Sequence, residues 1–146
     1  MAHPVTDLRV FLAGTWRIAR RIRDDRLAVM GRLTGRATFA PAPGGLVYDE
    51  NGALSFGAHQ GPATRRYHLS LDQSSIGEMR HADGSLFHML DLTSGLASVL
   101  HHCGDDDYRG RYRVLGDDCF FVNWRVSGPR KDYASTTRYS RISAAL

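Results

Sequence analysis

The sequence predicts an all-β protein: one antiparallel up-and-down β-barrel of about eight to ten strands, preceded by a short N-terminal helix. Two observations predict it. Apolar and polar residues alternate in short segments along the 146 residues, and turn signals rich in Gly, Pro and Asp separate these segments. The connections are short, so consecutive strands pair antiparallel. A meander of this length has to close or fold into two sheets, because an open one leaves exposed edges.

The first expected element is a helix in "TDLRVFL", residues 6–12, which is the only helix candidate. Thr6 or Asp7 is placed to cap its first turn, and Gly14 is placed to end it. Its apolar side consists of Leu8, Phe11 and Leu12.

The strands follow in series, each bounded by a break. "APAPGG" (40–45) and "HQGP" (59–62) are two of these breaks, and "ADG" (82–84) predicts a hairpin of the Asp-Gly type. We expect strands at residues 15–23, 29–40, 46–57, 63–71, 76–81, 85–92, 96–103, 108–115, 119–127 and 133–142.

The composition is that of a single globular domain, residues 1–146, with 42% hydrophobic and 23% charged residues. A chain of this length buries roughly 68–70% of its unfolded surface. No apolar run approaches the ~20 residues that cross a bilayer. The start, "MAHPVTDLRVFLAG", lacks the basic and then apolar order of a signal peptide. We therefore expect a cytoplasmic protein with no membrane partner.

The net charge is +4, and Lys131 is the only lysine among the 19 basic residues. Arginine binds carboxylates and phosphates through two fixed donors, so a cavity lined by it suits an anionic ligand. Nucleic-acid binding needs the charges gathered into one stripe. Here they are scattered from Arg9 to Arg141 with aspartates between them, so we expect no nucleic-acid partner.

Cys103 and Cys119 are too few for a disulfide framework, and we expect two free, partly buried thiols. His101, Cys103 and Asp105 are spaced by two, so a strand aims all three at one side. Consecutive residues on one face lie about 6–7 Å apart, which is wide for one ion. We therefore predict no metal site, and the sequence leaves the cofactor open.

Gly14, Thr15 and Trp16 form a Gly-x-Trp at the start of the first expected strand. Together with the short helix, the meander and a late arginine, this motif resembles the calycins, the lipocalin, fatty-acid-binding and nitrobindin-like barrels. The resemblance implies that Trp16 plugs the closed end of a barrel. It also implies that an arginine near the last strand, Arg138 or Arg141, packs across the tryptophan ring, where a cation–π contact is favourable.

The whole chain resembles an uncharacterised bacterial family of small calycin-like proteins, through "FLAGTWRIARRI", "GGLVYDENGAL", "DDDYRGRYRV" and "WRVSGPRKD". This resemblance implies a fold and no activity. Nitrobindins follow their tryptophan with a glycine-rich haem-side stretch, whereas "RIARRIRDD" stands here. Their haem-ligand histidine lies near the end of the chain, whereas the last histidine here is His102. A haem role is therefore not carried over.

A barrel of about eight strands has room for one small ligand. Tyrosine and tryptophan line pockets well, because each combines a large apolar body with one polar tip. Histidine and glutamate in the same cavity can bind a ligand or relay a proton. Lys131 lies in the "GPRKD" loop, where it or Arg130 is placed to pair with an anionic group at the barrel mouth. The predicted ligand-binding residues are Tyr48, Glu50, His68, His88, His101, Tyr108, Tyr112, Trp124 and Lys131.

Alternation shows which residues share a strand face, but it leaves open which face is inside. It places Arg109, Arg111 and Arg113 opposite Tyr108 and Tyr112, and we expect this arginine row on the solvated side.

Three interpretations of function follow. The first is a protein that binds a mostly apolar, anionic small molecule inside the barrel. The second is a small-molecule enzyme that uses Glu50, His88 or His101 for proton transfer in the same cavity. The third is a non-catalytic interaction module that forms a homodimer. The sequence contains no nucleophile elbow, phosphate-binding loop, dinucleotide fingerprint or zinc motif, so no catalytic residue is assigned.

Overall fold

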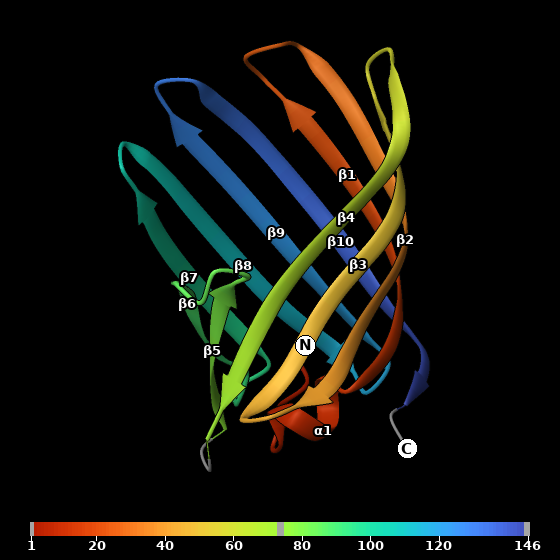
Figure 1. The fold of residues 1–146 in the computed structure, drawn as a ribbon, viewed down its shortest axis with the longest axis vertical. Helices are drawn as coiled ribbons and strands as arrows, with labels where there is room; N and C mark the ends of the chain where they lie inside the picture. Colours follow the sequence, from red (N-terminus) through yellow and green to blue (C-terminus); the bar gives the residue numbers. More distant parts are fainter. Residues whose placement is uncertain (1, 73–74, 145–146) are drawn as a thin grey trace.

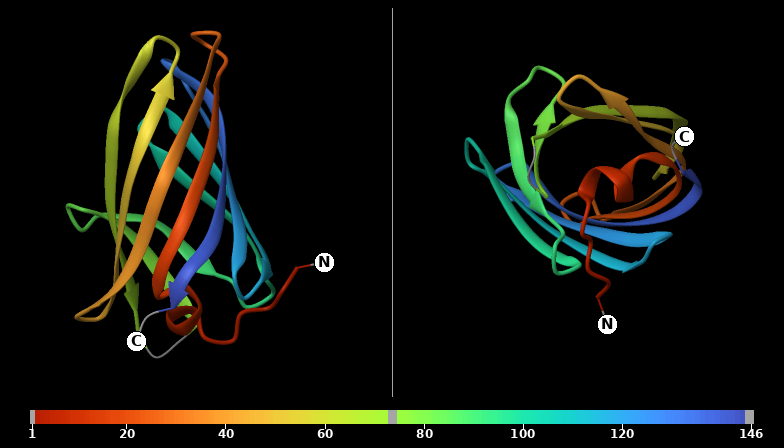
Figure 2. Two further views of the ribbon diagram at one scale, coloured as in Figure 1. Left: turned by 90° about the vertical axis from the view of Figure 1, so that its right-hand side faces the viewer. Right: turned by 90° about the horizontal axis from the view of Figure 1, so that it is seen from below.

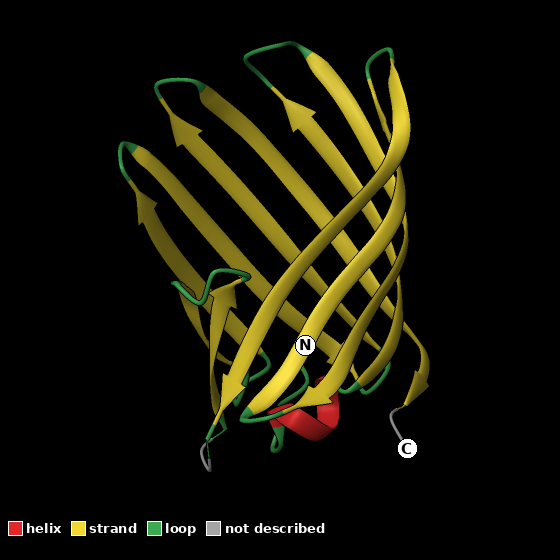
Figure 3. Ribbon diagram, viewed as in Figure 1, coloured by secondary structure: helices red, strands yellow, loops and turns green. Residues whose placement is uncertain are grey.

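The computed structural model describes residues 2–72 and 75–144. It is almost entirely β, with ten strands in a nearly closed barrel and one short helix below it (Figures 1 and 3). The elements are α1 (Leu8–Leu12), β1 (Gly14–Asp24), β2 (Val29–Ala42), β3 (Gly45–Phe56), β4 (His59–Leu71), β5 (Ile76–His81), β6 (Leu86–Asp91), β7 (Leu96–Cys103), β8 (Asp106–Gly116), β9 (Cys119–Gly128) and β10 (Lys131–Ala144). The predicted up-and-down barrel with an N-terminal helix is confirmed.

The ten strands form one antiparallel sheet in the order β6-β5-β4-β3-β2-β1-β10-β9-β8-β7. The two strands nearest the chain ends, β1 and β10, therefore pair in the middle of the sheet. The sheet edges are β6 and β7, which follow one another in the chain. Seen from below, the strands form a ring, and α1 lies across its lower end (Figure 2).

Most predicted strands begin and end within three residues of the observed ones. The exception is "HQGP" (59–62), which we expected as a turn but which forms the start of β4. The turn lies instead at Gly57 and Ala58, where Gly57 takes a positive φ of 58°. Glycine adopts such a φ at little cost, so the chain reverses two residues earlier than expected.

The lower end of the barrel is closed by α1 and Trp16. Asp7, one of the two expected caps, accepts a hydrogen bond from the Val10 backbone N–H (3.0 Å). The Trp16 side chain is 0% exposed, and its Nε1 donates to the Leu12 carbonyl (2.9 Å). The Arg141 guanidinium lies 4.1 Å from the centre of the Trp16 ring. Arg141 therefore packs on the tryptophan, whereas Arg138, the other candidate, is exposed.

The N-terminal segment before α1 links β8 to the residue that follows β6, below the barrel. The His3 backbone N–H donates to the Val114 carbonyl at the end of β8 (2.8 Å). Val5 is buried, and its N–H donates to the Leu92 carbonyl just after β6 (3.2 Å). The gap between β6 and β7 is thus bridged at its lower end by the chain itself.

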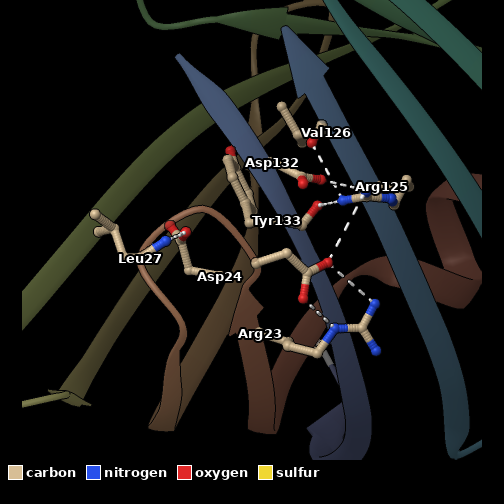
Figure 4. Close-up of polar contacts among 8 residues, drawn as sticks. Arg23, Asp24, Leu27, Arg125, Val126, Asp132 and Tyr133 are labelled. Carbon is tan, nitrogen blue, oxygen red and sulfur yellow. Dashed lines mark hydrogen bonds and ion pairs between the residues drawn. The ribbon is translucent and has the colours of Figure 1, made fainter. Parts of the chain in front are cut away.

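The upper rim is held by a charged cluster where the β1–β2 and β9–β10 turns meet (Figure 4). Asp25 accepts a hydrogen bond from Arg23 (2.9 Å) and lies 4.0 Å from Arg125. Arg125 also contacts Asp132 and donates to the Tyr133 carbonyl (2.9 Å). Arg23 and Arg125 are therefore neutralised by neighbouring carboxylates.

In the part of the chain that the structure describes, no helix is long and apolar enough to cross a membrane.

A polar and aromatic cavity inside the barrel

A cavity of about 410 Å³ lies inside the barrel. It extends from Leu12 and Phe120 at the plugged end to Tyr108 and Tyr133 near the upper turns. This volume falls within the range of roughly 300–1,000 Å³ that small-molecule pockets occupy. The barrel is therefore hollow, as a ligand-binding barrel has to be.

Seven of the nine predicted ligand-binding residues line this cavity: Tyr48, Glu50, His88, His101, Tyr108, Tyr112 and Trp124. His68 does not. It lies on the outer face of β4, because Tyr67 and Leu69 on either side of it point inward. We expected His68 in the ligand-binding site, but the structure places it outside the cavity. Lys131 lies at the rim, where its Nζ donates to the Tyr108 hydroxyl (2.8 Å) and pairs with Asp106 (3.1 Å).

A buried ion pair joins β1 to β3 across the cavity wall. Two nitrogens of the Arg20 guanidinium donate to the two Glu50 carboxylate oxygens at 2.9 and 2.7 Å. The side chains are 8% and 4% exposed. The remaining Arg20 Nε donates to the Thr137 hydroxyl on β10 (2.7 Å). This bidentate geometry satisfies both charges, which is what makes a buried pair tolerable.

Two tyrosines extend this network. The Tyr48 hydroxyl donates to Glu50 and lies 2.7 Å from the Tyr139 hydroxyl. Burial alone would raise the pKa of Glu50, but the hydrogen bonds and charge of Arg20 outweigh it and lower that pKa. Burial, reinforced by the Glu50 charge, raises the pKa of Tyr139 to about 12. Glu50 is therefore a fixed anion with occupied oxygens, which argues against its use as a proton donor.

His88 is held neutral deeper in the wall. Its Nδ1 lies 2.9 Å from the Met89 carbonyl oxygen, and its Nε2 lies 3.3 Å from the Tyr112 hydroxyl. A carbonyl only accepts, so Nδ1 carries the proton and Nε2 accepts from Tyr112. Burial lowers the pKa of His88 to about 4. Both ring nitrogens are therefore occupied at neutral pH.

This burial makes His88 a source of acid sensitivity. An unfolded histidine has a pKa of about 6.5, so between pH 6.5 and 4 the unfolded chain binds a proton that the folded protein does not. Stability therefore falls as the pH falls, and we expect His88 to account for a loss of about 3 kcal/mol by pH 4. Urea unfolding followed at several pH values measures it. His88→Gln should flatten this dependence, and an unchanged slope in that variant would assign it to other groups.

Aromatic rings form the upper half of the cavity wall. Phe87 is stacked on Trp124 with a centroid distance of 5.2 Å and on Tyr67 at 5.6 Å. The His101 ring meets Phe87 edge-on at 5.2 Å. Trp124 can lie this close to β8 because residue 110 is glycine, where an added Cβ would approach the indole to 2.8 Å. A ligand in this half meets flat apolar surfaces.

Arg65 on β4 is a cavity cation whose side chain makes no hydrogen bond or ion pair with the described residues, although it lies opposite Glu50 in the strand register. Its side chain lines the cavity and stays accessible to solvent through it. It lies 5.9 Å from the centre of the Tyr67 ring, and no group in residues 2–72 or 75–144 accepts a hydrogen bond from it. Arg20 and Lys131 are each paired with a carboxylate. The charge of Glu50 also acts on Arg65, but both Glu50 oxygens already accept from Arg20. The two arginines therefore share one carboxylate, and the cavity keeps a net positive charge.

Neither Arg20 nor Arg65 was among the predicted ligand-binding residues. A signal for each was present, because each shares its strand face with apolar residues. Arg20 alternates with Ile18 and Ile22, and Arg65 alternates with Tyr67. An arginine on the apolar face of a strand is either paired inside the protein or exposed to a cavity, and the two residues are one example of each.

No group of three or more His, Cys, Asp or Glu side chains among the described residues is arranged to hold a metal ion. Of the residues that we considered together, Cys103 is exposed and Asp105 lies in the turn after β7. Cys103 and Cys119 are free thiols, and Cys119 is half-buried. Burial of Cys103, which we expected, is not observed.

A family model described as a family of unknown function, DUF6314, matches residues 12–141. Among solved structures, the S-type phycobiliprotein lyase CPES from Guillardia theta is similar with a TM-score of 0.64 and 11% identity, over 92% of this chain and 90% of that one. A protein of unknown function from the DUF3598 family of Nostoc punctiforme has a TM-score of 0.63 and 15% identity. It matches 97% of this chain, which spans about half (51%) of that protein. No curated protein matches. These likenesses show the barrel fold.

Proposed function

The chain belongs to the DUF6314 family of unknown function, and we propose that it binds a small molecule inside the barrel, with the ligand's acidic group on Arg65. The ligand is mostly apolar and fills the aromatic upper half of the cavity. Phe87, Trp124 and Tyr67 supply the apolar contacts. The proposal rests on the fold, the cavity and one charge.

The unpaired guanidinium of Arg65 is the observation that carries the proposal. A charge that lines a cavity inside a protein attracts an opposite charge more strongly than one in bulk water. Arginine presents two parallel donors that match a carboxylate or phosphate. The other cavity charges are already matched, Arg20 by Glu50 and Lys131 by Asp106. An anion is therefore the group that the cavity lacks.

We also propose that residues 1–146 form a single domain and that the protein is cytoplasmic. The two free cysteines support that location, because thiols persist in reducing compartments and tend to pair in oxidising ones.

The fluorescent aromatic anion 8-anilinonaphthalene-1-sulfonate tests the site directly. We expect Arg65→Gln to weaken its binding about 10- to 100-fold, because a hydrogen bond to a charged group contributes about 1.5–3 kcal/mol. The neutral probe N-phenyl-1-naphthylamine should bind both proteins equally. Fluorescence titration measures both affinities.

Arg66→Gln is the matched control, since Arg66 is the next residue but lies outside the barrel and pairs with Asp49 (2.7 Å). It should leave the binding of the anion unchanged. Equal losses in Arg65→Gln and Arg66→Gln would refute contact between the anion and Arg65.

A further inference from the structure

The outer surface of the barrel carries a second concentration of positive charge, unrelated to the cavity. It covers five neighbouring strands of the sheet, β8, β9, β10, β1 and β2. We name the following eight exposed residues the arginine face: Arg17, Arg21, Arg32, Arg36, Arg109, Arg111, Arg113 and Arg138. None of the eight side chains makes a hydrogen bond or ion pair with any residue that the structure describes.

The strand register places some of these charges directly against each other. Arg17 on β1 lies opposite Arg36 on β2, and Arg21 lies opposite Arg32. Like charges in directly opposite positions of an antiparallel pair are destabilising. Arg23 and Arg125, at the upper rim beside this face, differ because Asp25 and Asp132 neutralise them (Figure 4). The eight charges of the arginine face are therefore uncompensated by the described residues, and four of them form two directly opposed, repulsive pairs.

An aromatic ring and a hollow lie among these charges. Phe121 is half-buried on the outer side of β9, opposite Arg113 on one neighbouring strand and Arg138 on the other. Beside it, a hollow of about 580 Å³ on the outer side of β7 to β10 is lined by Arg109, Arg111 and Asn123. The surface thus combines guanidinium groups with a ring and hydrogen-bonding side chains.

We propose that the arginine face binds single-stranded nucleic acid through its phosphate backbone, with a base stacked on Phe121. Same-face residues repeat about every 6–7 Å along a strand and strands repeat about every 4.8 Å, so the arginines form a regular array. A polymer with a repeating charge occupies such an array, one phosphate per guanidinium. Basic surfaces with an aromatic platform are typical of single-strand binding.

The shape of the face favours a flexible strand over a lipid bilayer. The outside of a barrel is convex, so a flat bilayer touches few of its strands at once, whereas a single strand follows the curve. The expectation of no nucleic-acid partner rested on charges scattered along the chain. The antiparallel register gathers eight of them on one surface. Nucleic-acid binding requires basic residues to be gathered in this way, and the linear sequence alone did not show it.

The test uses a fluorescein-labelled 20-nucleotide single-stranded DNA and fluorescence anisotropy over a series of salt concentrations. The logarithm of the affinity should fall linearly with the logarithm of the salt concentration, by about 0.7 per phosphate neutralised. The variant R109Q/R111Q/R138Q should weaken binding tenfold or more and reduce the slope by about 2. Its thermal stability should not fall, because none of these three side chains has a partner to lose.

Two further variants test whether binding depends on the arginine face itself or only on the total positive charge of the protein. R9Q/R66Q/R80Q removes three charges elsewhere and should cost little affinity. Phe121→Ser removes the ring without a charge, so it should weaken binding several-fold and leave the salt slope unchanged.

The proposal is overturned if the DNA does not bind, or if R9Q/R66Q/R80Q weakens binding as much as R109Q/R111Q/R138Q. It is also overturned if the protein binds phosphatidylserine vesicles and not the DNA. Arg65→Gln, which lies inside the barrel, should not change the binding of the DNA, so the two proposed sites fail or stand separately.

Discussion

Glu50→Gln is expected to lower the free energy of unfolding by about 3–5 kcal/mol, because it leaves the buried Arg20 guanidinium without its counter-charge. The amide keeps the size of the carboxylate, so the loss reports charge and not a cavity. Thr137 still accepts from the Arg20 Nε, but a hydroxyl does not neutralise a cation. Urea unfolding followed by circular dichroism measures the change.

The double variant Arg20→Met/Glu50→Leu provides the comparison. Replacing a whole buried pair with apolar residues of similar size is often neutral or stabilising, so this variant should be more stable than Glu50→Gln alone. Asp49→Asn, which breaks the exposed pair with Arg66 next door, should cost far less. A Glu50→Gln protein as stable as the parent would mean that water or another anion reaches Arg20.

Trp16→Ala is expected to cost a similar amount, about 3–5 kcal/mol, by leaving a large cavity at the closed end of the barrel. The Trp16 ring is packed edge-on against Phe120, with a centroid distance of 4.9 Å, and is tilted against Phe11 at 5.6 Å. Its loss also removes the hydrogen bond to Leu12 and the surface on which Arg141 lies. Thermal and urea unfolding measure the effect.

Trp124→Ala is the matched control, because it removes the same ring from the wall of a cavity that already exists. Trp124 is only half-buried, so its loss should cost less stability and should instead enlarge the ligand cavity. If the two alanine variants were equally stable, Trp16 would not be the plug of the barrel.

Much of the fold was predictable because it depends on local sequence. Period-two alternation and turn residues marked ten strands, and Gly14 and Trp16 marked the closed end. The turn at Gly57 was missed because "HQGP" contains stronger turn residues than the Gly-Ala pair that forms it. Pro62, the last residue of "HQGP", lies within β4 opposite Ala53, so this proline does not mark a turn.

The site was only partly predictable, because alternation identifies faces and not what occupies them. Tyr48, Tyr112 and Trp124 were recognisable as cavity residues from their chemistry. Arg20 and Arg65 each lie on the apolar face of their own strand. Arg20 is paired and Arg65 is not, because the Glu50 side chain reaches Arg20 across β2. Pairing between distant strands decides which charge is matched, and the pattern within a single strand does not contain that information.

The pairing of β1 with β10 also has a consequence for the order of folding. Every other strand pair joins neighbours in the chain, so the closure entropy of each is small, and two local meanders, β1 to β6 and β7 to β10, form readily. The contact between β1 and β10 carries most of the non-local cost, which makes it the slow event. We therefore expect β1 to be an open sheet edge during synthesis, until the C-terminal strands emerge. We expect its exposed arginines, Arg17, Arg21 and Arg23, to protect that edge, because a charged edge strand resists pairing with other nascent chains.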